Sequence, residues 1–170
     1  MKIICLLTLF LCSLFATSCK SDLPTTTATN TSRIDSITLY DPSSDFSFPS
    51  DSASIDTAWI ASDNLSLAIH YGGGCKRHRF KFFAWNVFLH DFIPEVVGFL
   101  SHDGNGDQYA IPQFDTLTFS LLPLKDNYFS WTQSDSSSEH KLYLIVNEPI
   151  PIHDNRWLLY SFYGKTHQSK

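Results

Sequence analysis

Tyr71-Gly72-Gly73-Gly74-Cys75-Lys76-Arg77-His78-Arg79-Phe80 is the stretch from which the fold of this chain can be worked out. It separates residues 65–71 from residues 78–85, and in both segments apolar and polar residues alternate. A period of two is typical of β-strands, and a longer loop that carries glycine suits a β-hairpin. We therefore expect a hairpin here, with Gly72, Gly73 and Gly74 supplying positive φ angles.

Alternating patterns also occur elsewhere, at residues 34–40, 57–61, 95–102, 116–121, 142–147 and 156–163. A loop rich in Ser, Asp and Pro is expected at residues 41–54, a tight turn at residues 103–107 and one helical turn at residues 123–127. About six to seven strands with this spacing predict a single all-β domain, an antiparallel β-sandwich over residues 34–166.

Composition agrees with a packed domain. The chain has 170 residues, of which 43% are hydrophobic, and its 14 Phe and single Met favour strands over helices. The formal net charge is −5. Phosphate contacts need a basic surface, so we expect no nucleic-acid partner.

The N-terminus resembles a bacterial lipoprotein leader. Lys2 precedes an uncharged, mostly apolar run, and Ala16-Thr17-Ser18-Cys19 resembles a lipobox, in which the cysteine receives the lipid. We expect residues 1–18 to be the signal peptide and residues 19–33 to be the lipidated cysteine and a flexible linker. A cleaved secretory signal with an incidental cysteine is the alternative.

Position 20 is Lys, so the Asp that retains lipoproteins at the inner membrane is absent, and Lys20-Ser21-Asp22 is similar to surface-export signals of Bacteroidota. We expect a cell-envelope protein, held at the outer membrane by palmitate and other acyl chains and exposed at the surface. Two of the other cysteines, Cys5 and Cys12, would leave with the leader, so we expect no internal disulfide in the mature chain.

Several candidate side chains are expected at one end of the sandwich. If each strand crosses the sandwich once, the loops after residues 65–71, 95–102 and 142–147 share an end. The residues placed there are Cys75, His78, His102, Asp103, Asp107, His153 and Asp154.

The first hypothesis for this end is a metal site. Cys75-x-x-His78 has the spacing of a half-site, and His102 with Asp103 or Asp107 could complete it for zinc or copper. The alternative, which we prefer, is that Cys75 is a small buried residue and His78 a hydrogen-bonded one, with no cofactor.

Two other chemistries are less favoured. Cys75 could be a nucleophile, with His102 as its base and Asp103 or Asn105 as the orienting group. Nothing nearby resembles a nucleophile elbow, so we expect that the protein is not an enzyme. Asp103-x-Asn105-x-Asp107 resembles the start of a calcium loop, yet an EF-hand needs Gly and Glu where this chain has Gln and Phe.

Aromatic residues raise the possibility of a glycan ligand. They could form a sugar-stacking platform, although most are expected in the core. The residues are Trp59, Trp85, Trp131, Trp157, Tyr160 and Tyr163. The cations Lys76, Arg77 and Arg79 are interpreted as a solvated turn.

The motifs taken together resemble a known family. Gly72-Gly73-Gly74-Cys75-x-x-His78-x-Phe80, then His102-Asp103-x-x-Gly106-Asp107, within residues 64–125, look like the C-terminal part of NigD-like lipoproteins of Bacteroidota. The resemblance implies an anchored β-rich module without an established catalytic role.

Members of that group often carry a cysteine where this chain has Tyr109. If that cysteine pairs with the first one in relatives, a disulfide joins the two loops in those proteins. In this chain Cys75 would then be free, and Tyr109 would cover it. We expect Gly72, Gly73, Gly74, Gly106 and Asp107 to be structural residues of the two loops.

The sequence therefore predicts a lipid-anchored β-sandwich module with a binding or structural role. Its partners are expected to be the membrane, through the lipid, and another envelope protein or a glycan. The alternative is an envelope protein that binds zinc or copper through Cys75, His78 and His102.

Overall fold

The computed structural model describes residues 34–89, 91–134, 138–150 and 155–164. The leader, Cys19 and the linker lie outside these residues, as do His153 and Asp154. The described residues form nine strands and one helix: β1 (Ile34–Ser36), β2 (Thr38–Tyr40), β3 (Ala53–Ala61), β4 (Asn64–Gly73), β5 (Arg79–Trp85), β6 (Glu95–Asp103), β7 (Ile111–Ser120), α1 (Leu122–Thr132), β8 (Glu139–Asn147) and β9 (Arg156–Tyr163).

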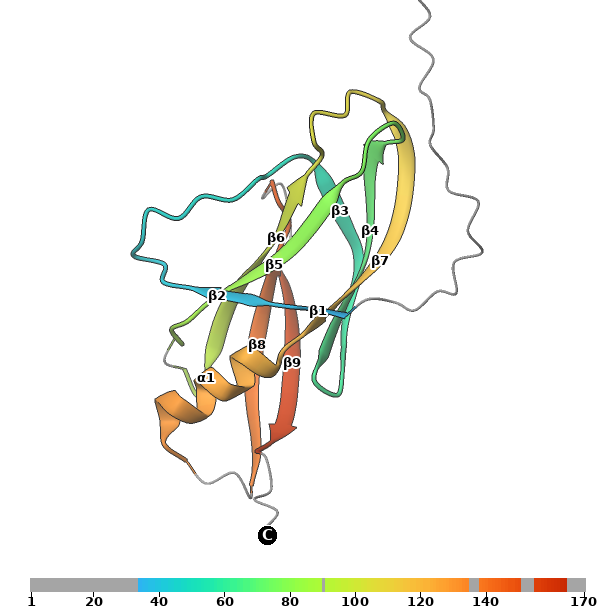
Figure 1. Ribbon diagram of the computed structural model, residues 1–170. Coiled ribbons are helices and arrows are strands. Elements are labelled where there is room, and N and C mark those ends of the chain that lie inside the picture. Colours follow the sequence, from blue (N-terminus) through green and yellow to red (C-terminus); the bar gives the residue numbers. More distant parts are fainter. Residues whose placement is uncertain (1–33, 90, 135–137, 151–154, 165–170) are drawn as a thin grey trace, which may run out of the picture.

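The strands form two sheets that pack face to face, so the predicted β-sandwich is confirmed (Figure 1). The first sheet has the order β1-β7-β4-β3 and the second the order β2-β5-β6-β8-β9. We expected antiparallel pairing throughout, and that part of the prediction is wrong. Three pairs of strands are parallel: β1 with β7, β2 with β5, and β6 with β8.

The expected hairpin around the glycine-rich loop is wrong. β4 belongs to the first sheet and β5 to the second, so residues 74–78 cross from one sheet to the other. β4 already has two long antiparallel neighbours: it meets β3 through a tight turn at residues 62–63 and pairs with β7 along its whole length. No edge of β4 is left for β5.

Two more segments cross between the sheets at the same end, at the top of Figure 1. Residues 104–110 lead from β6 to β7, and residues 41–52 lead from β2 to β3. The expectation that the loops after β4 and β6 share an end is therefore confirmed.

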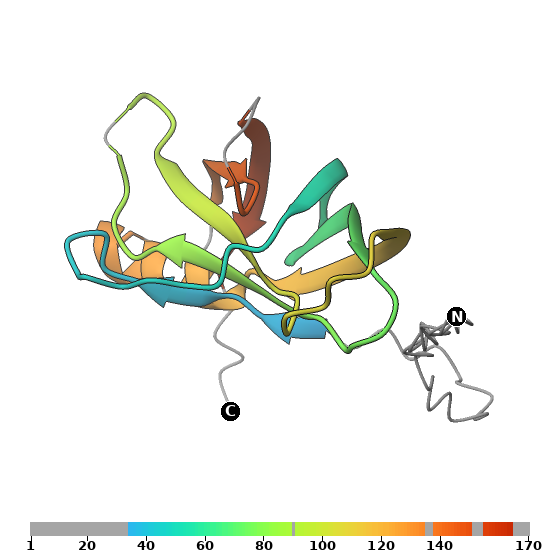
Figure 2. The same cartoon turned by 90° about the horizontal axis from the view of Figure 1, so that it is seen from above.

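The first two strands join the sheets along one side. β1 pairs with the last three residues of β7 and β2 with the last three of β5, and the buried Ile37 lies between them. Figure 2 shows this blue segment running along the edge of both sheets. The upper parts of β5 and β7 extend beyond it.

The core lies between the sheets. Alternate residues of the inner strands are fully buried, as the period of two predicted. They include Leu65, Leu67 and Ile69 of β4, Phe82 of β5, Leu100 of β6, and Leu142 and Leu144 of β8. Burying a side chain of this size stabilises the fold by about 1.5 to 3 kcal/mol.

The helix is longer than the single turn that we expected at residues 123–127. It begins next to Pro123, and it ends where Gln133, with φ of +50°, donates its N–H to the Phe129 carbonyl. Its Leu124, Lys125 and Tyr128 are buried, so packing stabilises a helix whose sequence has little amphipathic periodicity.

Asp63 fastens the other end of the sandwich to this helix. Its carboxylate accepts hydrogen bonds from Tyr160 Oη at 2.5 Å and from Lys125 Nζ at 3.2 Å. Burial, and then this carboxylate, raise the pKa of Tyr160 above its ordinary value. The buried hydroxyl therefore stays a donor at physiological pH.

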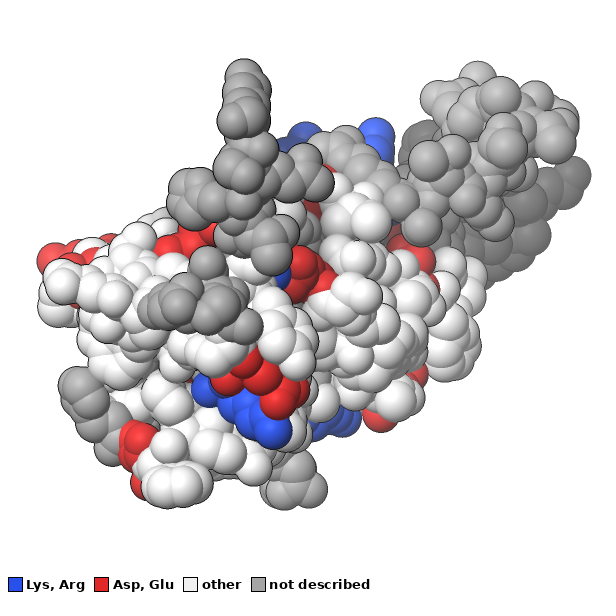
Figure 3. Space-filling view, turned by 90° about the horizontal axis from the view of Figure 1, so that it is seen from below, with Lys and Arg blue, Asp and Glu red and all other residues white. Residues whose placement is uncertain are grey.

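The surface seen from below carries charge in small patches. On its described part, red and blue atoms gather locally among white ones, without a broad basic area (Figure 3). None of the described helices is long and apolar enough to cross a membrane.

A pair of leucines on neighbouring strands tests where the core lies. Leu144 is 0% exposed and Leu159 is 47% exposed. Leu144→Ala should lower the free energy of unfolding by about 2 to 5 kcal/mol, because it leaves a cavity. Leu159→Ala is the control and should change it by less than about 1 kcal/mol, because no buried space is emptied. Urea denaturation measures both, and equal losses would contradict this assignment of the two faces.

Candidate functional site

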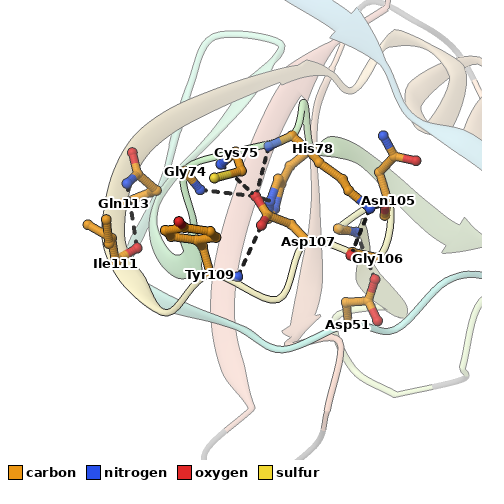
Figure 4. A network of polar contacts seen from close by, with 12 residues as sticks. Asp51, Gly74, Cys75, His78, Asn105, Gly106, Asp107, Tyr109, Ile111 and Gln113 are labelled. Atoms are coloured by element: carbon orange, nitrogen blue, oxygen red, sulfur yellow. Dashed lines mark hydrogen bonds and ion pairs between the residues drawn. The ribbon is translucent and has the colours of Figure 1, made fainter. Parts of the chain in front are cut away.

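The side chain of Asp107 is bound by the glycine-rich loop. Its Oδ2 accepts the N–H groups of Gly74, Cys75 and Lys76 at 3.1, 2.9 and 2.9 Å (Figure 4). Three successive amides pointing at one oxygen form an anion-binding nest. Here the chain fills its own nest, and the Asp107 side chain is only 1% exposed.

The same carboxylate has two further partners. Its Oδ1 accepts the N–H of Tyr109 at 3.0 Å, and His78 Nε2 lies 3.3 Å from Oδ2. The Tyr109 amide, followed by the loop amides and His78, holds the pKa of Asp107 well below its ordinary range against the opposing effect of burial. Asp107 is therefore a carboxylate at any physiological pH.

His78 and His102 continue the network toward the third crossing segment. His78 Nδ1 lies 2.7 Å from His102 Nε2, and His102 Nδ1 lies 3.2 and 3.0 Å from the carbonyl oxygens of Asp51 and Ser52. The ring of Phe80 stacks on His102 with centroids 4.5 Å apart. His78 is 5% exposed at its side chain, and His102 is 2% exposed.

The partners set the number of protons on the two rings. Carbonyl oxygens and a carboxylate only accept, so His102 Nδ1 and His78 Nε2 must both carry a proton. The two facing nitrogens share a third. The pair therefore completes all of these hydrogen bonds only when it holds three protons in total.

Burial lowers the pKa of His102 most and the neighbouring His78 lowers it further, against the hydrogen bonds to the Asp51 and Ser52 carbonyls, which raise it. His102 is thus the neutral member, accepting through Nε2 and donating through Nδ1 to the two carbonyls. The chain of contacts runs from the Asp107 carboxylate through His78 and His102 to the carbonyls of Asp51 and Ser52.

Further contacts close the arrangement. Asp51 Oδ2 accepts the N–H of Gly104 at 2.7 Å, and Lys76 Nζ donates to the carbonyls of Asn105 and Gly106 at 3.0 and 2.9 Å. We call these residues the end clasp: Asp51, Ser52, residues 74–78, His102 and residues 104–107. It joins the three segments that cross between the sheets at this end.

Local backbone geometry makes the clasp possible. Asn105 and Gly106 have φ of +54° and +62°, and Asp107 donates its N–H to the Gly104 carbonyl, so the predicted turn at residues 103–107 is confirmed. In the glycine run only Gly74 has positive φ, at +141°. Gly72 and Gly73 are strand residues, which corrects our expectation for them.

Gly73 is needed for a different reason. A Cβ at this position would lie 2.6 Å from His78 Nε2 and 2.8 Å from its Cε1. The ring cannot move away, because His102 and Asp107 hold it on both sides. A Cβ at Gly72 would lie 3.5 Å from the Tyr109 carbonyl oxygen and 3.6 Å from Ala110 Cα, which are ordinary contact distances.

The metal hypothesis gains no support from the described residues. Among them no group of three or more His, Cys, Asp or Glu side chains is arranged to hold an ion. His78 and His102 direct nitrogens at each other, and Asp103 Oδ1 accepts the N–H of Asn105 instead of facing them. Zinc or copper binding by Cys75, His78 and His102 stays a prediction.

Cys75 is not a free thiol in this structure. Its sulfur is in a disulfide. The expectations that Cys75 is free and that no internal disulfide forms are therefore not supported, and the nucleophile hypothesis depends on the first of them. Tyr109 follows the clasp and is about half exposed beside this loop (Figure 4).

The aromatic residues do not form one platform. Tyr160 is buried, and Trp85 donates its Nε1–H to Tyr40. The exposed ones are spread over three elements: Trp59 lies on β3, Trp131 on α1, and Trp157 and Tyr163 on β9.

Sequence reasoning did not find Asp51 and Ser52. They lie in the loop of residues 41–52, about 50 positions before His102, and no local motif links the two. The acidic residues of that loop were the only available signal.

No family model and no curated protein matches this chain. Solved structures are similar to it. A protein of unknown function (DUF1344) from Bacteroides vulgatus ATCC 8482 shares 13% identity, with a TM-score of 0.47 over 79% of this chain and 58% of that one. A predicted lipoprotein from Bacteroides fragilis NCTC 9343 shares 10% identity, with a TM-score of 0.45 over 79% and 72%.

A NigD-like immunity protein from Bacteroides caccae ATCC 43185 shares 14% identity, with a TM-score of 0.49 over 78% of this chain and 65% of that one. The chain spans less than two thirds of this structure and of the DUF1344 protein. The likeness concerns the fold alone. A NigD-like protein, which the motifs indicated, is thus among the structures to which the chain is similar.

Two neighbouring glycines test the close contact with His78. Gly73→Ala should lower the free energy of unfolding by about 1 to 3 kcal/mol, because the new methyl group overlaps a ring that is fixed on both sides. Gly72→Ala is the matched control and should change it by no more than about 0.5 kcal/mol. Urea denaturation of both variants gives the comparison, and an unchanged Gly73→Ala variant would show that the ring is not held in place.

The carboxylate of Asp107 should make stability sensitive to acid. Its folded pKa is depressed, so its contribution is present in full above the unfolded value of about 3.9 and is lost as the pH falls below it. Asp107→Asn should lower the Tm at pH 7, and its deficit should shrink between pH 4 and pH 2. Asp103→Asn, in the same turn, is the control and should leave the profile unchanged. A deficit that stays constant with pH would contradict a role for the charge.

Proposed function

We propose that the chain is a lipid-anchored module of the bacterial cell envelope with a binding role and no catalytic one. The leader and the lipobox support the anchor, because the apolar run of residues 3–16 ends in Ala16-Thr17-Ser18-Cys19. The linker of residues 20–33 would then separate the acyl chains from β1, where the folded part begins.

The observation that carries the non-catalytic role is the complete pairing of the end clasp. Among the described residues no buried side-chain nitrogen or oxygen lacks a hydrogen-bond partner. Both nitrogens of His78 and of His102 are engaged with protein groups. A general base needs an open nitrogen within reach of a substrate, and this arrangement offers none.

A binding role fits what the clasp does. It holds three crossing segments in one arrangement, so the surface at this end is preorganised, and a preorganised surface loses less entropy when a ligand binds. The lipid would keep that surface at the membrane, and the partner would be a glycan or another envelope protein.

Acylation of Cys19 is the direct test. The full chain, expressed in a Bacteroides host with radiolabelled palmitate, should incorporate label and sediment with the outer membrane. Cys19→Ala should abolish the label and release the chain from the membrane fraction. Cys12→Ala, within the leader, is the matched control and should be labelled normally. Label that persists in Cys19→Ala, or a secreted unlabelled wild-type chain, would refute the anchor.

A further inference from the structure

A groove opens beside the clasp, between the edges of β5 and β7. Two adjoining cavities of about 510 and 560 Å³ share Asp35, Arg77, His78, Phe80 and Phe119 in their walls. The groove exists because β1 and β2 cover only the last three residues of β7 and of β5. Its size is that of a small-molecule site and not of a protein interface.

One wall of this edge groove is basic. Arg77, Arg79 and Lys81 line it and are exposed. Within the part of the chain that the structure describes, none of the three takes part in an ion pair. Three unpaired cations within five residues of a chain with net charge −5 leave a local positive field.

The guanidinium groups determine which ligand chemistry this wall suits. An Arg side chain presents a planar fork of donors that matches a carboxylate or a phosphate. Lys76, the fourth cation of the stretch, is already bound to the carbonyls of Asn105 and Gly106. The two arginines and Lys81 are therefore the groups available to an anion.

The opposite wall is of another kind. It is formed by Asp35 of β1 and by Asp115, Thr116 and Thr118 of the neighbouring β7. Asp115 lies close enough to Tyr71 to raise the pKa of that phenol, in addition to the larger effect of burial. A ligand that is only an anion would be repelled by this wall, whereas hydroxyl groups can donate to it.

Between the two walls lie aromatic rings. Tyr71 and Phe80 are partly buried, with centroids 5.0 Å apart at an interplanar angle of 61°. They offer an apolar surface for the C–H face of a flat, ring-shaped ligand. An acidic sugar combines these three features: it has a carboxylate at one edge, hydroxyls at the other and an apolar ring face.

We infer that the edge groove binds a carboxylated sugar, with its carboxylate on Arg77 and Arg79, its hydroxyls toward Asp115 and its ring against Tyr71 and Phe80. This inference rests on the binding role proposed above and names its ligand class. His78 belongs to both the groove wall and the clasp, so the pose of the ligand depends on the same pairing that holds the loops.

The test uses the full chain purified in detergent and titrated with methyl β-D-glucuronide. Methyl β-D-glucoside and inorganic phosphate are the comparison probes, and saturation-transfer NMR is the readout. The glucuronide should bind with a Kd of about 1 mM or below, at least about tenfold tighter than the glucoside, because charge-assisted bonds to Arg add to the hydroxyl contacts.

Variants then test which side chains of the two groove walls contact the ligand. Arg77→Gln with Arg79→Gln should weaken glucuronide binding by about tenfold or more, and Asp115→Asn should weaken the glucuronide and the glucoside alike. Lys141→Gln, which removes an exposed cation of β8 outside the groove, is the matched control and should change nothing. The thermal unfolding of each variant confirms that it is folded.

Three outcomes would overturn the inference. The glucuronide and the glucoside could bind equally, which removes the role of the carboxylate. Phosphate could bind as tightly as the glucuronide, which leaves a plain anion site. The third outcome is that none of the probes binds. Each of these results leaves the anchor intact, because acylation is measured at Cys19, whereas loss of palmitate label would refute the anchor without touching the groove.

Discussion

The arrangement of this molecule depends on one buried carboxylate and the amides that surround it. Asp107 comes from the segment that leaves β6, and Gly74, Cys75 and Lys76 come from the segment that leaves β4. Because those strands belong to different sheets, the carboxylate joins the two layers at one end. His78 and His102 extend the connection to the loop of residues 41–52.

The clasp also shows how one set of residues can look like a catalytic or metal site and still be structural. A carboxylate, two histidines and a glycine-rich loop of amides are the components of many active sites. Here the hydrogen-bonding groups of each component are used by another residue of the clasp. What remains open to solvent is the neighbouring groove, where the cations of β5 have no partner in the described chain.

Much of this architecture could be predicted from the residues. The strand patterns of residues 65–71 and 95–102, the turn around Asn105-Gly106 and the shared end of their loops were all predicted, because period and turn chemistry are local properties. The helix was underestimated, because its stability comes from Leu124 and Tyr128 packing into the core and not from its own pattern.

By itself, the sequence determined that the chain is all-β, where its strands alternate, and which residues carry ionisable groups near the glycine-rich loop. Only the tertiary structure decided that this loop crosses between sheets instead of closing a hairpin, because β3 and β7 occupy both edges of β4. It also decided that His102 bonds to carbonyls some 50 residues away, and that β5 and β7 leave a groove between them. Contacts across such separations are set by the packing of the two sheets, which no local pattern encodes.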